Sequence, residues 1–316
     1  MKIKWKVLRQ IIYLKHILWY FYRDKYYWSF FLAISFGLLI YFLNHFFYPS
    51  NFWNNFTTKE GISVWFCEYT DMNRVVRQPI NTFTNIWYVV NALFFLSKGI
   101  SDYRKPKSYN LITANPYYSI LLGIISIYTF LSSTFYHSSL ISIASKLDYS
   151  AVYSISLFPL MYYTHRIILN KRNKPTNKKH PKEVRAIIFV FSLIYILLTF
   201  FIPLKAVHPI VLSFIILTAL GGYYLEKVEP NKTNKLYLIL MVVTITIAVF
   251  LFKIDYEKVA CNPESFIQPH SLWHIFNSLT VFYIYLYFRS ENYDSKKDPK
   301  IYNIKQQYFD NKNDTI

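Results

Sequence analysis

Long apolar stretches alternate with short polar segments along most of the chain. Eight stretches are of a length that crosses, or nearly crosses, the hydrocarbon core of a bilayer as a helix. They lie at residues 28–47, 82–96, 117–136, 148–163, 186–204, 209–225, 236–252 and 272–288. The pattern predicts an all-α integral membrane protein.

Composition supports this prediction, because 53% of the 316 residues are hydrophobic and only 16% are charged, unlike a typical soluble domain. Residues 1–27 mix cations with Trp, Ile and Leu, which predicts a basic helix lying at the membrane interface. Residues 290–316 are polar and charged, and are expected to form a poorly ordered cytoplasmic tail.

The net charge of +18 indicates topology once its placement is considered. With a cytoplasmic N-terminus, the outer loops hold only seven of the 35 Lys and Arg residues, which leaves 28 inside. The outer seven are Lys59, Arg74, Arg77, Lys146, Lys205, Lys253 and Lys258. This asymmetry predicts a multi-pass protein with both termini cytoplasmic. It also removes the reason to expect a nucleic-acid partner.

Polar residues within membrane spans are costly and therefore informative. Ser133 and His137 lie one turn apart at the outer end of the third span, and Asp148 lies at the outer start of the fourth. His270 and His274, in "QPHSLWHIF", begin the eighth span from the same side. The predicted topology therefore brings these five residues to one depth, toward the outer (periplasmic or lumenal) face.

Three neutral imidazoles that leave a fourth position open are a common ligand set for catalytic zinc. Asp148 is then placed to accept and return a proton, and Ser133 to donate to a developing oxyanion. Each residue also has a simpler interpretation. A histidine near a membrane surface can be an interfacial anchor, Ser133 can bond to its own helix, and Asp148 can cap the fourth span.

The segments "SSTFYH", "LDYS" and "HSLWHI" together resemble the pattern of the alkaline ceramidases, whose wider group of membrane hydrolases includes the adiponectin-receptor-like proteins. "WFCEYTDMNRVVRQPINTFTNIWY" resembles the ceramidase segment that runs from a Cys-Glu pair into the first core helix. The resemblance implies a seven-helix membrane domain at residues 49–289 and one extra N-terminal transmembrane helix at 28–48. It also implies zinc on His137, His270 and His274, with Ser133 and Asp148 as catalytic residues.

The same resemblance implies a calcium site in the Cys-Glu segment, with Glu68 and Asp71 as candidate ligands. Gln78 and Trp65 stand where the ceramidase pattern has carboxylates, and calcium prefers six to eight oxygen ligands. An ordinary solvated loop acid is the alternative interpretation of Glu68.

The implied function is a zinc-dependent amidohydrolase that cleaves a membrane lipid amide such as ceramide into a fatty acid and a sphingoid base. Its partners would be the lipid substrate and the bilayer, with no obligate protein partner. A zinc-stabilised lipid receptor or sensor without turnover is the alternative, and a structural or trafficking protein with an empty site is the third.

Both cysteines of the chain, Cys67 and Cys261, fall in predicted outer loops, which face an oxidising compartment. A disulfide between them is predicted, and it would hold the Cys-Glu segment beside the loop that leads to His270.

Overall fold

A computed structural model describes residues 27–58, 66–105, 109–203, 206–228, 233–259 and 261–291, with the side chains of residues 27–30 excepted. The predicted interfacial segment before Tyr27, the predicted tail beyond Glu291, and Trp65 lie outside these residues. Ser290 and Glu291, the first two residues of that tail, pack into the bundle, and Glu291 is fully buried.

The described residues form helices and no β-strand. Each of the eight apolar stretches corresponds to a long helix, which confirms the all-α prediction. The long helices are α2 (Tyr27–Phe46), α5 (Ile86–Arg104), α7 (Tyr117–Ser139), α8 (Ser142–Lys171), α9 (Pro181–Phe201), α10 (Val207–Val228), α11 (Lys235–Tyr256) and α12 (Pro269–Arg289). Two short helices, α4 (Pro79–Thr84) and α6 (Leu111–Ala114), precede α5 and α7.

Four of these helices, α7, α9, α10 and α11, are long and apolar enough to cross a membrane, as in a multi-pass membrane protein. Helices α8 and α12 are less apolar, because polar residues such as His165, Arg166, His270 and His274 are buried within the bundle and contact protein. Polar side chains are tolerated within a membrane protein where groups on other helices form hydrogen bonds or ion pairs with them.

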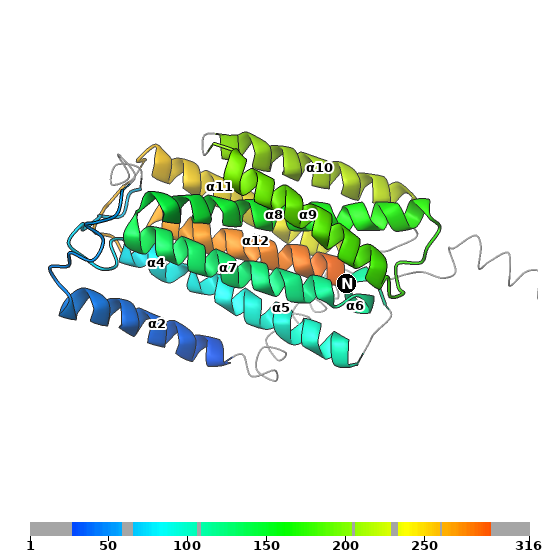
Figure 1. The fold of residues 1–316 in the computed structure, drawn as a ribbon, viewed down its shortest axis with the longest axis horizontal. Helices are drawn as coiled ribbons and strands as arrows, with labels where there is room; N and C mark the ends of the chain where they lie inside the picture. The colour runs from blue at the N-terminus through cyan, green and yellow to red at the C-terminus, as the bar shows by residue number, and fades with distance from the viewer. Residues whose placement is uncertain are drawn as a thin grey trace, which may run out of the picture.

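The long helices run side by side along the long axis of the molecule, with α12 in the middle (Figure 1). Helix α11 packs closely on α12, α5 packs on α7, and α8 contacts α7, α9 and α10. Helix α2 lies at the edge of the bundle, against α4 and α5. Its Asn44 side chain both donates to the Val76 carbonyl and accepts from the Val76 N–H, at 2.9 and 2.8 Å.

Polar contacts hold the two ends of the bundle together. One end, here called the Cys67 end, holds the 66–78 loop, α4, the last turn of α11 and the first turn of α12. At the opposite end, Arg166 of α8 pairs with Glu291, and Arg289 of α12 pairs with Asp102 of α5. These ion pairs are buried or nearly so, so they fix the helices at the end remote from the histidines.

Candidate metal centre

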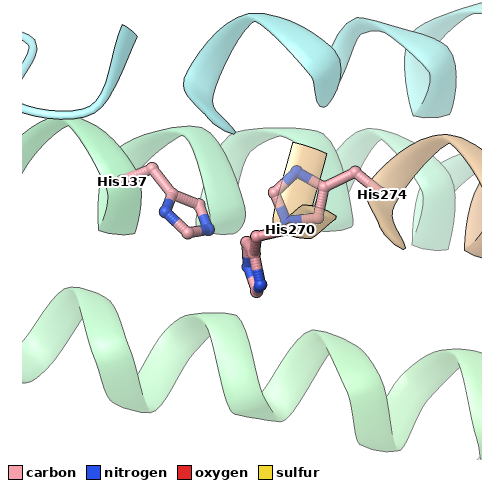
Figure 2. Close-up of side chains that lie close together, drawn as sticks. All are labelled: His137, His270 and His274. Atoms are coloured by element: carbon pink, nitrogen blue, oxygen red, sulfur yellow. The ribbon is translucent and has the colours of Figure 1, made fainter. Parts of the chain in front are cut away.

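The imidazoles of His137, His270 and His274 converge at the Cys67 end (Figure 2). Their ring centroids are 4.7–5.0 Å apart. One nitrogen of each ring lies within 4.8 Å of the others, and all three side chains are buried. This arrangement can hold a metal ion.

Two helix ends place the rings. His137 lies in the last turn of α7, which ends at Leu140 in the left-handed conformation with φ 54°. His270 and His274 lie in the first two turns of α12, which begins at Pro269. A proline is well suited to the first position of a helix, and a spacing of four residues puts both imidazoles on one face.

His137 is oriented by Gln78, the residue immediately before α4. Its Nδ1 donates to the Gln78 Oε1 at 2.7 Å, and the Gln78 Nε2 in turn donates to Thr70. Because an amide oxygen can only accept, the proton of His137 is on Nδ1. Its Nε2 therefore carries the lone pair, and this atom is buried without a hydrogen-bond partner.

His274 is oriented in the same way from α4. Its Nδ1 lies 3.1 Å from the Asn81 carbonyl oxygen and 3.2 Å from the Thr84 hydroxyl. The carbonyl can only accept, so Nδ1 carries the proton and the Nε2 lone pair is left for a ligand.

His270 faces a carboxylate of α11. Its Nδ1 lies 3.8 Å from the Asp255 Oδ2, and both side chains are buried. The other Asp255 oxygen accepts the Cys67 N–H at 3.0 Å. The Phe66 ring covers the His270 ring with a centroid distance of 4.2 Å. A carboxylate on the side of an imidazole away from the metal commonly orients that ligand and raises its basicity.

Gln78, the Asn81 carbonyl and Asp255 each lie near the Nδ1 atom of one ring, which leaves the Nε2 side of that ring for a metal. One nitrogen of each buried ring lies within 4.8 Å of the others, a spacing that a bound cation would explain. Metal-binding histidines usually donate their other N–H to the protein, as His137 and His274 do here. No other His, Cys, Asp or Glu of the described residues joins the three in a metal-binding group.

Ser133 lies one turn before His137 on α7 and is buried. Its neighbour Ser132 bonds back to the Tyr128 carbonyl at 2.8 Å. No such bond is found for Ser133 within the described part of the chain. The predicted role of Ser133 as a donor to an oxyanion stays a prediction.

Asp148 lies in the second turn of α8, which begins at Ser142 after Ile141 as the N-cap. The capping interpretation of Asp148 is therefore wrong. The side chain is half-buried and within electrostatic range of Tyr88, Tyr128 and Tyr136. Since Tyr136 precedes His137 and Tyr88 follows α4, Asp148 faces the same end of the bundle as the histidines.

Glu68 and Asp71 already have partners within the protein. The two Glu68 oxygens accept the Ile80 and Asn81 N–H groups at 2.7 and 2.8 Å, so the carboxylate caps α4. Burial raises the pKa of Glu68 to about 7, against the lowering effect of these two bonds. Asp71 bonds to the Asn73 N–H and pairs with Arg74 at 3.2 Å. Glu68 is thus not a solvated loop acid, and it helps to hold the helix that orients His274.

The predicted disulfide between Cys67 and Cys261 is confirmed, with the two Cα atoms 5.5 Å apart. It joins the 66–78 loop to the segment before α12. Phe66 of this loop packs on the His270 ring, and the Cys67 N–H donates to Asp255. The disulfide therefore fixes residues that surround the candidate metal centre.

Sequence reasoning missed the residues that orient the histidines, namely Asn81, Thr84 and Asp255, and treated Gln78 only as a departure from a pattern. Asp255 carried a signal: it is an acidic residue at the end of an apolar helix in "FLFKIDY", at the same end as the histidines. Asn81 acts through its backbone carbonyl, so no side-chain pattern could reveal it.

Comparison with known protein families gives a match to the Per1-like family over residues 82–292, well over half of the chain. The chain belongs to the Per1-like family. The matched region contains Ser133, His137, Asp148, His270 and His274, while the Cys67–Gln78 segment lies before it. A search among curated proteins finds no match.

Per1-like membership corrects the resemblance drawn from the motifs, because this family is different from the alkaline ceramidases and the adiponectin receptors. The assignment as a ceramidase acting on sphingolipid amides is therefore wrong. The motifs misled because a chain of the Per1-like family carries the same His, Ser and Asp residues at these spacings.

Proposed function

We propose that this protein is a metal-dependent integral-membrane hydrolase that removes an acyl chain from a membrane lipid by cleaving an ester bond. The observation that carries the proposal is the trio of buried imidazoles, one nitrogen of each lying within 4.8 Å of the others. The family supports the substrate class, since Per1-like proteins are involved in lipid remodelling, in particular of glycosylphosphatidylinositol anchors. Acyl chains on a glycerol backbone are esters.

Zinc is the proposed metal, held by His137, His270 and His274, because three imidazoles and one open position are a common catalytic zinc set. When bound, zinc supplies a Lewis acid and lowers the pKa of its water toward ~7.

The chain's own residues have distinct tasks in this proposal. Gln78 and the Asn81 carbonyl orient the rings of His137 and His274 through their Nδ1 atoms, and Asp255 faces the His270 Nδ1 at 3.8 Å. The Ser133 hydroxyl donates to the oxygen of the substrate carbonyl as negative charge develops there. Asp148 takes a proton from the attacking water and returns it to the leaving alkoxide oxygen. Phe66, over His270, limits the access of water.

The membrane arrangement is part of the proposal. Helices α5 and α7–α12 form a seven-helix transmembrane core, and α2 is an additional span at its edge. The distribution of Lys and Arg supports cytoplasmic termini and an outward-facing Cys67 end. The metal centre would then meet lipids of the outer leaflet.

The test is a paired measurement of metal and turnover on protein purified in lipid nanodiscs. We expect about one zinc ion per chain by mass spectrometry, and release of fatty acid from an inositol-containing glycerolipid with labelled acyl chains. His274→Ala should lose both. Wild-type protein that holds zinc but releases no fatty acid from any ester lipid would refute the enzyme proposal, and the receptor alternative would then stand.

A further inference from the structure

The loop between α11 and α12 exposes its apolar side chains and buries a polar one. Phe266 is 89% exposed and Ile267 is 71% exposed, whereas Gln268 is fully buried. Phe266 is the most exposed large apolar residue in the part of the chain that the structure describes. A loop that faces water usually has the reverse pattern, because Phe and Ile are mostly buried and Gln is mostly exposed. The pattern indicates apolar surroundings.

Hydrogen bonds hold the loop in this form. The Ser265 hydroxyl oxygen accepts the Ile267 N–H at 3.0 Å. The Gln268 Nε2 lies 2.6–3.2 Å from the carbonyl oxygens of Asn262, Pro263 and Ser265. The backbone therefore wraps around the Gln268 amide, and the two apolar side chains are left outside. Their exposure belongs to an ordered loop.

The loop is joined to the metal centre on both sides. Ile267 precedes His270 by three residues, so their Cα atoms are at most about 11 Å apart at ~3.3–3.6 Å per residue. On the other side, the disulfide at Cys261 and the bond from the Tyr69 N–H to the Pro263 carbonyl, at 3.1 Å, tie the loop to the segment that supports α4. Whatever surrounds the two apolar side chains therefore also fixes the depth of the histidines.

Helix lengths put the loop at the surface of a bilayer. Helix α11 is apolar and long enough to cross a membrane, and α12 packs closely along it. With 22 and 21 residues, they are about 32–33 Å long, slightly more than the ~30 Å hydrocarbon core. Phe266 and Ile267 come three and two residues before Pro269, the first residue of α12. They would thus lie where the hydrocarbon meets the head groups.

We propose that Phe266 and Ile267 insert into this boundary layer of the bilayer and hold the metal centre at the depth of the lipid ester groups. The ester groups of a glycerolipid join its acyl chains to its head-group region, so they lie at the same boundary. Insertion rests on the loop and its helices, whereas the consequence for hydrolysis rests on the proposed function.

The size of the exposed pair favours lipid over a protein partner. A stable protein interface buries about 800 Å² on each side, and even a large aromatic side chain supplies only about 150–250 Å². Two side chains are therefore too few for such an interface. Glu264, two residues before Phe266, is also exposed, and its carboxylate can stay among the head groups while the ring enters the acyl region.

The test uses the full chain in phosphatidylcholine nanodiscs, with a nitroxide label on Phe266→Cys. Both native cysteines are held in the disulfide, so the new thiol is labelled alone. Glu264→Cys is the matched control from the same loop. Paramagnetic resonance measures collisions with oxygen, which concentrates in the membrane, and with a nickel chelate, which stays in water. The label at 266 should collide mainly with oxygen, and the label at 264 mainly with nickel.

Two results would overturn the proposal. Equal collision of both labels with the nickel chelate would show that the loop lies in water. A label at 266 that is shielded from both reagents would show that protein covers it.

A second measurement connects insertion to turnover. Phe266→Ser should lower kcat/KM for an inositol-containing glycerolipid in the bilayer by about 10-fold, and leave it unchanged for a short-chain ester dissolved in water, because only the first substrate depends on depth. Phe201→Ser is the control, since this ring is 75% exposed at the end of α9, a helix that packs on α8. It should change neither value.

These outcomes separate the two proposals. A label at 266 in the membrane, on a protein that releases no fatty acid, would support insertion and refute the hydrolase. A label at 266 in water, with the same lipid hydrolysis in Phe266→Ser as in the wild type, would support the hydrolase and refute insertion.

Discussion

At the scale of single residues, the three histidines that could hold a metal are distinct from Ser133 and Asp148, the residues proposed to act on a substrate. The three histidines present ring nitrogens within 4.8 Å of one another. Ser133 and Asp148 lie outside that group, one turn from His137 and on a neighbouring helix. Substitutions at these positions should therefore have different effects on metal content and turnover.

Asp148→Asn should keep zinc and the fold, and lower turnover by ~10²–10⁴-fold, the usual effect of losing a general acid or base. Asparagine keeps the volume of the side chain but cannot carry the proton. Zinc content by mass spectrometry and fatty-acid release are measured on the same sample. Loss of zinc from this variant would instead make Asp148 a ligand or an orienting residue.

Ser133→Ala should lower turnover by ~10²–10³-fold with zinc retained, which is the scale of one missing oxyanion donor. Ser132→Ala is the matched control, because both side chains are buried and adjacent, and Ser132 only bonds to its own helix. Equal activities for the two variants in a kcat measurement would show that Ser133 has no such role.

Asp255→Asn should weaken zinc binding by ~10–100-fold, because the carboxylate that faces the His270 Nδ1 is lost. Asp102→Asn, a buried aspartate at the opposite end of the bundle, should leave zinc affinity unchanged. Competition with a zinc chelator measures both affinities. An equal loss in the two variants would indicate general destabilisation.

At the scale of elements, the 66–78 loop and α4 support the metal centre, although neither contributes a ligand. Gln78 and α4 orient two of the histidines, and Glu68 caps α4 from the loop. The disulfide fixes this loop to the segment before α12. The loop therefore fixes the position of the residues that orient the histidines.

The Glu68 cap should make stability depend on pH. Its pKa is raised from 4.5 to about 7, so the folded protein binds this proton more tightly than the unfolded chain does. The stabilisation is complete below pH 4.5 and is lost as pH rises toward 7, by up to roughly 3 kcal/mol. Glu68→Gln should remove this slope.

The measurement is thermal unfolding between pH 4.5 and 8 in a His274→Ala background, where metal release by acid does not interfere. Glu264→Gln, a change of an exposed loop acid, serves as the control and should keep the wild-type slope. Parallel curves for Glu68→Gln and the control would contradict the prediction.

At the scale of the whole molecule, charge distribution and bundle geometry together predict which end faces the cytoplasm. The loop between α8 and α9 is rich in Lys and Arg, and the Cys67 end is not. Arg166 and Arg289 also lie toward the end opposite the histidines, where each is paired with an acid. Basic residues thus collect at one end of the bundle.

Labelling with a membrane-impermeant maleimide should therefore modify Asn54→Cys in intact cells, and Lys179→Cys only after the membrane is permeabilised. Both positions are exposed, and the two native cysteines are held in the disulfide. Labelling of Lys179→Cys in intact cells would reverse the orientation.

The sequence by itself determined the helices and the three histidines of the candidate metal centre. Apolar length is a local property, and a spacing of four residues puts His270 and His274 on one face whatever the rest of the fold. His137 could be grouped with them because the predicted topology puts the end of its helix at the same membrane depth. The motifs alone did not determine the family, since they resemble those of a family to which the chain does not belong.

Only the tertiary structure decided which histidine atoms converge and which partners orient the rings. The proton of His137 is placed by Gln78, 59 residues away in sequence, and the ring of His274 by the Asn81 carbonyl, 193 residues away. Such contacts depend on how a loop crosses the end of the bundle. The spacing of residues along the chain does not predict these contacts, because helix packing brings together residues that are far apart in sequence.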